Sequence, residues 1–399
     1  MPSQDTSGRL YIGLMTGTSM DGVDGVLVEI PDNYTGGFLP LTSAAHIPFN
    51  EDLRRLLMSL QLPSDNEIER EALVANDLAN IYARCVFRLL EQSCLTPGFV
   101  TAIGVHGQTI RHRPELGYTR QTNNPALLAE LTGIDVIADF RSRDLAAGGQ
   151  GAPLVPAFHH ALFGNSGNSC VVVNIGGIAN ISILTRDRKT IGFDTGPGNV
   201  LLDAWIAKYQ GLLYDENGQW AASGEPDSEL LAVMLKEPFL SLPPPKSTGR
   251  DLFNEEWVEA KLASALEFTV LSPVDIQATL AAFTITTIAD AITRYAPDAD
   301  KIFICGGGAR NTHLVSGLEA ALEKPMPDTD VVTSEVIGID PTHIEGLAFA
   351  WLAHRFTNRL PGNLPGVTGA HGPRILGALY PGMMDKDVTA FFGKTGAAE

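Results

Sequence analysis

The sequence lacks several features that would place it in a specialised class of protein. It has only four cysteines in 399 residues, and their spacing fits neither a zinc site nor a disulfide framework. We therefore expect reduced thiols in a cytoplasmic protein. The four are Cys85, Cys94, Cys170 and Cys305.

Basic residues are also scarce: 28 Lys and Arg stand against 46 Asp and Glu, which gives a formal charge of −18. Such a charge repels nucleic acid and anionic membranes, so neither is expected as a partner. The N-terminal stretch MPSQDTSGRL has no basic region followed by an apolar run, which predicts no secretory signal. No apolar run is expected to be long enough to cross a bilayer.

The composition is otherwise that of an ordinary soluble protein, with 44% apolar and 19% charged residues. A chain of 399 residues exceeds one compact core, so two domains are expected. Strands alternate with helices, which predicts an α/β fold. The polar, Gly-rich stretch GNSGNS at 164–169 is the best candidate linker, which predicts domains at 1–163 and 164–341.

One pattern occurs twice. Residues 12–30 (IGLMTGTSMDGVDGVLVEI) and 171–184 (VVVNIGGIANISIL) each read as an apolar run, a turn of Gly and small polar residues, and a second apolar run. This pattern predicts a β-hairpin. Two such turns facing each other across a cleft can bind a polyphosphate through backbone N–H groups and hydroxyls. A plain hairpin with a polar turn is the alternative for each one taken alone.

The remaining elements follow from periodicity and breakers. Helices are predicted near 67–93, 125–132, 157–163, 200–210, 275–296, 312–322 and 342–356, and strands near 101–110, 135–139 and 301–305. Residues 214–255 and the tail after Thr357 are predicted to be irregular.

The loop GFDTGPGN at 192–199 is the richest in chemistry. Asn199 is a good N-cap for the next helix, whose N-terminus favours an anion. Asp194 precedes that positive end, where a carboxylate can bind Mg²⁺ or act as a general base. An Asx turn that only holds the loop is the alternative.

Other polar residues have a functional and a structural reading. Arg141 and Arg143 flank a Gly-rich loop and can bind a carboxylate or phosphate, or pair with a nearby Asp on the surface. Glu345 opens the last helix, where an acid also favours the helix dipole. His106 in GVHGQT is expected to be structural, and Lys246 lacks the glycines of a P-loop.

The loop CGGGARN at 305–311 follows a strand and precedes a helix. It can cradle the adenosine of a nucleotide, or a dinucleotide pyrophosphate. It lacks the full G-x-G-x-x-G spacing, and a plain strand-to-helix turn is the alternative.

Taken in order, the three Gly turns resemble the superfamily of actin, hexokinase and the heat-shock ATPases. IGLMTGTS resembles its first phosphate hairpin, NIGGIANISIL its second, and IFICGGGARN its adenosine loop. HIEGLAFAWLA resembles the last connecting helix, so about 342–399 are expected to join the first domain. The resemblance implies two ribonuclease-H-like domains around a nucleotide and substrate cleft. It implies nucleotide binding by Gly17, Thr18, Ser19, Met20, Asp21, Gly22, Val23, Asp24, Gly176, Gly177, Gly306, Gly307 and Gly308.

Within that superfamily the chain is most similar to the anhydro-N-acetylmuramic acid kinase family. The similar motifs span nearly the whole chain: GTSMDGVD, GVHGQTI, DFRSRDLAAGGQGAPLVP, VNIGGIANIS, GFDTGPGN, PPPKSTGRD and LPGVTGA. Two departures from the wider superfamily stand out, because the acids it usually carries near Met15 and Asn174 are absent. The sequence therefore assigns no metal ligand, and Asp194 and Glu345 are candidates beside phosphates and water. Gly366 stands where the family often has Ser.

The resemblance implies an enzyme that uses ATP and Mg²⁺ to open a 1,6-anhydro amino sugar and phosphorylate its 6-oxygen, for peptidoglycan recycling. Asp194 would be the base that activates water, Arg141 or Arg143 would bind the lactyl carboxylate, and Glu345 would bind a sugar hydroxyl. An ordinary sugar or acyl kinase and a non-enzymatic nucleotide switch are the alternatives. A homodimer is compatible with the sequence, although no interface stripe stands out.

Overall fold

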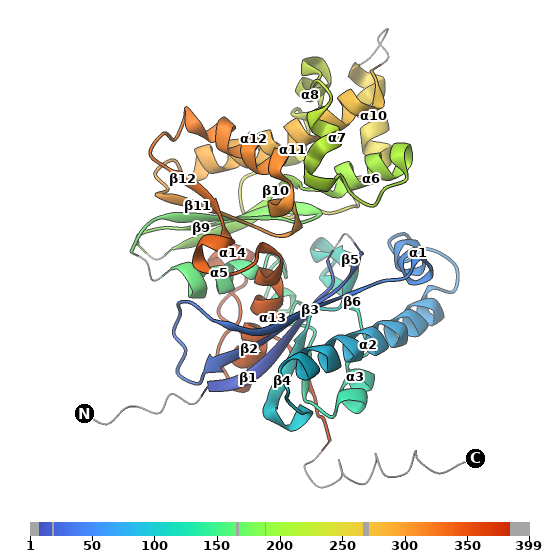
Figure 1. Ribbon diagram of the computed structural model, residues 1–399, viewed down its shortest axis with the longest axis vertical. Helices are drawn as coiled ribbons and strands as arrows, with labels where there is room; N and C mark the ends of the chain where they lie inside the picture. Colours follow the sequence, from blue (N-terminus) through green and yellow to red (C-terminus); the bar gives the residue numbers. More distant parts are fainter. Residues whose placement is uncertain (1–7, 18–19, 165–166, 188, 266–270, 384–399) are drawn as a thin grey trace.

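The computed structural model describes residues 8–17, 20–164, 167–187, 189–265 and 271–383. Figure 1 shows two sheets stacked one above the other, each with helices on its outer face and with α5, α13 and α14 between them. The first sheet has the order β13-β7-β4-β1-β2-β3. Its strands are β1 (Gly8–Met15), β2 (Gly22–Pro31), β3 (Leu41–Pro48), β4 (Val100–Val105), β7 (Val136–Ala138) and β13 (Ala378–Tyr380).

The second sheet repeats the design of the first. Its order is β10-β9-β8-β11-β12. Its strands are β8 (Cys170–Ile175), β9 (Ile178–Leu184), β10 (Thr190–Pro197), β11 (Lys301–Cys305) and β12 (Asp330–Thr333). In both sheets the first three strands are antiparallel neighbours and the next two run parallel to the first. This shared order confirms the expected α/β class with two ribonuclease-H-like units. A separate hairpin pairs β5 (Gln108–Arg113) with β6 (Tyr118–Thr122).

The first unit is built around its strands' alternation. Ile12 and Leu14 of β1 pack in a core with α2, while Tyr11 packs in another core with α13. Helix α13 lies directly on β1: a Cβ at Gly13 would come within 1.9 Å of the Gly346 carbonyl oxygen. The helices that precede the second sheet in the chain are α1 (Glu51–Ser59), α2 (Glu67–Gln92), α3 (Pro125–Thr132), α4 (Ser142–Leu145) and α5 (Val155–Phe163).

Helices cover the outer face of the second sheet (Figure 1). They are α6 (Val200–Gln210), α7 (Gln219–Ala222), α8 (Ser228–Met234), α9 (Pro238–Ser241), α10 (Glu255–Ala265), α11 (Pro273–Tyr295) and α12 (Thr312–Glu323). The chain then returns through α13 (Ile344–Thr357) and α14 (Pro365–Thr368) to β13, which pairs with β7 of the first sheet. Short 3₁₀ helices occur at Pro97–Phe99, Pro114–Leu116, Glu216–Gly218, Gly307–Arg310, Ser334–Ile337 and Pro341–His343.

Three expectations from the sequence need correction. The segment 214–255 is not irregular but holds α7, α8 and α9, and α8 begins at an N-cap where Asp227 accepts from the Leu230 N–H at 2.7 Å. The tail after Thr357 adds a helix and a strand. The strand predicted at 101–110 is broken at Gly107, which has a φ of +82° that most other residues avoid.

The sequence reading predicted no apolar run long enough to cross a bilayer. Judged by length and composition alone, that prediction was wrong. Helix α11 is long and apolar enough to cross a membrane, with 23 residues. In the structure, 67% of its apolar window is buried inside the protein. Ile276, Leu280 and Phe283 of this helix pack in the core of the second unit. Helix α11 is therefore a core helix of the second unit.

Candidate functional site

Asp194 lies near the end of β10, where the pairing with β9 is interrupted. It is in register with Asn180, and the register shifts between Asp194 and Gly196. Such a bulge re-aims side chains at the end of a strand. The Asp194 side chain is 8% exposed, and its Oδ2 accepts a hydrogen bond from the Thr248 N–H at 2.9 Å.

Burial raises the pKa of the Asp194 carboxyl to about 7. The Thr248 N–H and the positive charges of Arg141 and Lys246 act in the opposite direction but do not outweigh burial. A carboxylate with a pKa near 7 can take a proton at neutral pH far better than an ordinary Asp. The geometry therefore suits Asp194 to the role of general base.

The loop that holds Asp194 was missed by sequence reasoning. The Asp194 main-chain N–H donates to the Lys246 carbonyl at 3.1 Å, and the Thr248 N–H donates to the Asp194 side chain. Residues 246–248 therefore bind both the main chain and the side chain of Asp194. The Lys246 ammonium donates to the carbonyls of Phe239 and Leu240 at 3.1 and 3.0 Å. These contacts of Lys246 agree with the rejection of a P-loop. The sequence signal that could have pointed to this loop was the motif PPPKSTGRD.

Of the two candidate arginines, Arg141 is the one whose charge acts on Asp194 and Glu345. The positive charge of Arg141 lowers the pKa of both Asp194 and Glu345, because it stabilises their carboxylate forms. Arg141 donates to His106 Nε2 from Nε at 3.1 Å and from Nη2 at 2.9 Å, and from Nη1 to the Gly151 carbonyl at 2.8 Å. Arg143 is exposed. Among the described residues neither arginine forms the surface ion pair that the sequence left open.

Glu345 lies in the first turn of α13 and faces the second sheet. The Asn174 side-chain amide donates to Glu345 Oε1 at 3.3 Å. Asn174 stands near a position where the wider superfamily usually has an acid, so this position contacts Glu345. Burial, and secondarily the charge of Asp24, raise the pKa of Glu345, whereas Asn174 and Arg141 lower it. Helix α13 thus brings Glu345 to the same neighbourhood as Arg141.

The first phosphate turn follows β1. Thr18 and Ser19 lie outside the described residues. Met20 has a φ of +53°, and its N–H donates to the Gly17 carbonyl at 3.3 Å. The side chains of Met20 and Val23 are buried in the core, so only their backbone can face a ligand. Of the remaining candidates, Asp21 is exposed, Gly22 is buried, and Asp24 is partly buried.

The second turn packs against the start of α6. The N–H groups of Asn199 and Val200 donate to the carbonyls of Gly176 and Gly177 at 2.8 and 3.0 Å. A Cβ at Gly198 would come within 2.2 Å of the Gly176 carbonyl oxygen, so glycine is required there. Asn199 is the N-cap residue of α6, as the sequence predicts, but its side chain forms no capping hydrogen bond. The helix N-terminus is engaged by the turn itself.

The Gly-rich loop after β11 lies beside the second turn. Gly306 has a φ of +81°, and a Cβ there would come within 2.3 Å of Asn174 Oδ1. Gly308 is equally close to the Ile175 side chain, whereas a Cβ at Gly307 would meet open space. The loop and the second turn are therefore adjacent in the structure.

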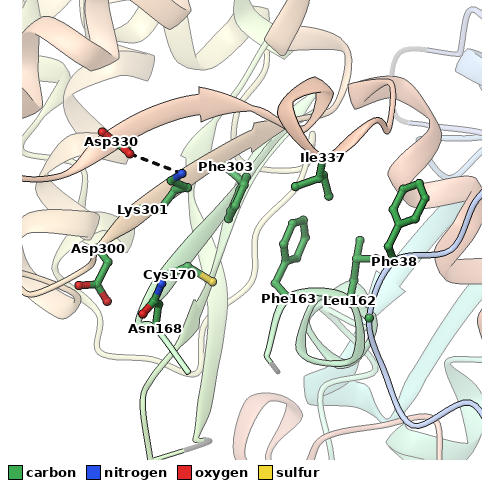
Figure 2. A pocket seen from close by; sticks show the side chains of 11 residues that line it. Phe38, Leu162, Phe163, Asn168, Cys170, Asp300, Lys301, Phe303, Asp330 and Ile337 are labelled. Carbon is green, nitrogen blue, oxygen red and sulfur yellow. Dashed lines mark ion pairs between the residues drawn. The ribbon is translucent and has the colours of Figure 1, made fainter. Parts of the chain in front are cut away.

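No group of three or more His, Cys, Asp or Glu side chains that could hold a metal ion is found among the described residues. A separate cavity of about 620 Å³ lies at the other end of the second sheet, where the side chains of Phe38, Phe163 and Phe303 gather (Figure 2). Its Lys301 and Asp330 are paired with each other at 3.4 Å. Lys301 and Asp330 begin their strands, whereas Asn174 and Gly306 lie at or beyond strand ends.

Known proteins resemble this chain over almost its whole length. The family model described as anhydro-N-acetylmuramic acid kinase matches residues 9–382. A protein of that name from Paraburkholderia xenovorans (strain LB400) is 54% identical over 380 residues, covering 95% of this chain and 100% of the relative. One from Cupriavidus pinatubonensis (strain JMP 134 / LMG 1197) is 55% identical over 379 residues, covering 94% and 99%.

Solved structures with a similar arrangement are far more distant. The activator of the 2-hydroxyisocaproyl-CoA dehydratase from Clostridium difficile, with bound ADPNP, has a TM-score of 0.45 at 12% identity and covers 88% of this chain and 96% of its own. A ROK family glucokinase from Streptomyces griseus, in complex with glucose and AMPPNP, has a TM-score of 0.41 at 13% identity and covers 86% and 98%.

Proposed function

This chain belongs to the anhydro-N-acetylmuramic acid kinase family, and we propose that its residues carry out that family's reaction as follows. The chain is a phosphotransferase of peptidoglycan recycling that acts on a small sugar. Its substrate is 1,6-anhydro-N-acetylmuramic acid and its product is the 6-phosphate of the opened sugar. The observation that supports this most strongly is Asp194, a buried carboxylate with a pKa raised to about 7 beside Arg141.

The chemistry balances as a coupled hydrolysis and phosphoryl transfer. Asp194 takes a proton from water as the water oxygen bonds to the anomeric carbon. The bond between that carbon and the 6-oxygen breaks, and the 6-oxygen bonds to the γ-phosphorus of ATP while ADP leaves. Phosphoryl transfer needs mainly positioning and neutralised charge. The protein's task at the sugar is therefore to hold water, base and anomeric carbon in line.

Substrate binding divides between two residues. Arg141 rather than Arg143 binds the lactyl carboxylate, because Arg141 is held in the site and Arg143 is exposed. Glu345 accepts a hydrogen bond from a sugar hydroxyl, supported by the Asn174 amide that fixes its Oε1 at 3.3 Å. Both residues belong to the first sheet's side of the site.

ATP binding is assigned to the two turns and the Gly-rich loop. The phosphates lie between the turn at 17–24 and the turn at Gly176 and Gly177, and adenosine lies at Gly306–Gly308. A cation such as Mg²⁺ fits near Asp24 and Glu345, because the pKa of Glu345 is raised mainly by burial and further by the negative charge of Asp24. It would be held mainly by phosphates and water, with these two carboxylates nearby, and would neutralise charge on the transferred group.

Isotope-labelled water tests the reaction. In H₂¹⁸O with ATP and the anhydro sugar, one label should appear on the anomeric oxygen of the product and none on the phosphate. An ordinary sugar kinase would consume ATP with reducing sugars and introduce no label. A nucleotide switch would show no sugar-dependent ATP turnover. Either of these results would remove the proposal.

Three wider features stay proposals. The division at 163 and 341, with the segment from about 342 in the first domain, is supported by the pairing of β13 with β7. The last part of that segment, 384–399, lies outside the described residues. Cytoplasmic localisation is supported by four cysteines without a disulfide. A homodimer, and the absence of nucleic-acid or membrane partners, rest on sequence and charge alone.

A further inference from the structure

We infer that His106 is a positioning residue that fixes the Arg141 guanidinium in the orientation needed to grip the substrate's lactyl carboxylate. The inference rests on the proposed function, because it concerns how that sugar is recognised. His106 carries no role in the sequence reading beyond a structural one. The contacts around Arg141 assign it a more specific task.

His106 can only be an acceptor toward Arg141. An arginine side chain has donors and no acceptor, so His106 Nε2 must offer its lone pair to the Nε and Nη2 hydrogens at 3.1 and 2.9 Å. This requires a neutral imidazole with its hydrogen on Nδ1. The ring is buried and lies 4.8 Å from the Phe349 ring. A neutral ring is therefore held between the sheet and α13.

The surroundings keep His106 neutral at physiological pH. Burial, followed by the charge of Arg141, holds the pKa of His106 well below its usual range, although the backbone carbonyls of Thr16 and Gly107 act in the opposite direction. The described groups that face the ring are Arg141, these carbonyls and Phe349 of α13. No carboxylate contacts the ring among the described residues.

A second contact, from the Gly151 main chain, fixes the other side of the Arg141 guanidinium. The Gly151 carbonyl accepts from Nη1 at 2.8 Å, and the Gly151 N–H donates to Asp144 Oδ2 at 2.8 Å. Asp144 is fully buried and also accepts from Asn363 and Thr368 at 2.7 and 2.8 Å. The carbonyl that aims Arg141 is thus fixed by the C-terminal tail.

These contacts leave a specific pair of donors. A guanidinium has five N–H groups, and His106 and Gly151 accept from three of them. The other two, one on Nη1 and one on Nη2, have no partner among the described residues. We assign the Nη1 hydrogen on the Cδ side to the Gly151 carbonyl, which leaves the two free N–H groups side by side on the end of the fork. This arrangement binds a carboxylate through both oxygens. His106 therefore selects which edge of Arg141 faces the sugar.

His106 also belongs to the segment that supports the first phosphate turn. Its main-chain N–H donates to the Leu14 carbonyl at 3.0 Å, and the Thr16 hydroxyl donates to the neighbouring Gly107 carbonyl at 2.9 Å. The same short segment thus contacts the carboxylate-binding arginine and the end of β1. Loss of the His106 side chain should mainly affect sugar binding, because the backbone contacts to the turn remain.

The test compares two amides of different reach. In His106→Gln the side-chain oxygen can replace Nε2 as acceptor, whereas in His106→Asn it falls short of Arg141. We expect His106→Asn to raise the KM for anhydro-N-acetylmuramic acid at least tenfold, with KM for ATP within about twofold. His106→Gln should restore the sugar KM to within about threefold of the wild type. The matched control is His159→Leu, which removes another buried histidine, bonded to Ser182, and should leave the sugar KM unchanged.

A second probe isolates the carboxylate. 1,6-Anhydro-N-acetylglucosamine has the same bicyclic ring without the lactyl group, so its inhibition constant should be the same in the wild type and His106→Asn. Equal weakening of both sugars would overturn the inference, as would an unchanged KM for the muramic sugar. Failure of the wild type to turn over the muramic sugar would instead remove the proposed function.

The pH profile separates positioning from proton transfer. If His106 only positions Arg141, the acid limb of kcat/KM near pH 7 should persist in His106→Gln, because that limb belongs to Asp194. Disappearance of the limb in this variant would assign the proton transfer to His106 and overturn the inference.

Discussion

The two halves of the molecule place corresponding rows of residues across their first three strands, and the rows differ in how deeply their acidic side chain is buried. In the first sheet Met15, Asp24 and His46 lie in register across β1, β2 and β3. In the second, Asn174, Asn180 and Asp194 lie in register across β8, β9 and β10. The same backbone design thus presents one acid in each row, on different strands.

Burial separates the two acids. In the first row Asp24 accepts from His46 Nδ1 at 2.8 Å, with side-chain exposures of 36% and 45%. In the second row Asp194 is 8% exposed and its charge is held by a backbone N–H of the loop at 246–248. A solvated pair gains little from its contact, whereas a buried acid acquires a new pKa. Duplication therefore supplies the frame, and the loop packed on one copy makes that copy reactive.

The largest test of this contrast removes the second-row acid. Asp194→Asn should lower kcat by about a thousandfold, since a general base contributes 10²–10⁴, while ATP binding changes little because Asn keeps the size and the Thr248 contact. Steady-state turnover and ATP titration would measure both. The first-row counterpart, His46→Gln, should keep kcat within about twofold. Turnover of Asp194→Asn within tenfold of the wild type would end its assignment as the base.

The second test is the pH dependence of the wild type. Because Asp194 must be ionised to accept a proton and burial raises its pKa to about 7, kcat/KM should fall about tenfold per pH unit below that value. The measurement is initial rates from pH 5 to 9 with ATP saturating. A profile that stays flat down to pH 5 would mean that the working base has an ordinary carboxyl pKa.

The loop that distinguishes the two rows can be altered on its own. Thr248→Pro removes the N–H that stabilises the Asp194 carboxylate, so the acid limb should move to higher pH. Thr248→Ala keeps the N–H and should retain the wild-type limb. A limb at the same pH in all three proteins would show that the hydrogen bond does not set the pKa of Asp194.

Sequence reasoning predicted much of this frame. Both hairpins, helix α2 and helix α11 follow from periodicity and turn residues near each element. The segment that carries Asp194 was expected to be a loop, but it is part of strand β10 (Thr190–Pro197). The choice between Arg141 and Arg143 could not follow, because it depends on the tail residues Asn363 and Thr368 bonding Asp144 more than 200 positions away. The loop that clips Asp194 is likewise 54 residues from it. Such contacts form only when distant segments pack, so they leave no local period in the sequence.

A smaller test concerns stability. The pKa of Asp194 is raised in the folded protein from 3.8 to about 7, so its ionised form destabilises the fold above that range and not below it. Asp194→Asn should therefore melt a few degrees higher than the wild type at pH 8, on the order of 1–4 kcal/mol, and the gain should vanish near pH 4. Melting curves across this range would measure it. A gain that is equal at both pH values would show packing rather than charge as the cause.

The smallest expected effect has the opposite sign in pH. The hydrogen bond to Asp24, opposed by partial burial, raises the pKa of His46 above its ordinary value. Its stabilisation is therefore full below pH 6.5 and is lost as pH rises through the folded-state pKa. His46→Gln should cost a few tenths of a kcal/mol at pH 5.5 and nothing at pH 9, because the pair is solvated and weak. Chemical denaturation at both pH values would measure the difference. A cost that grows toward high pH would mean that the first row is governed, like the second, by a destabilised charge, and the contrast between the two halves would fail.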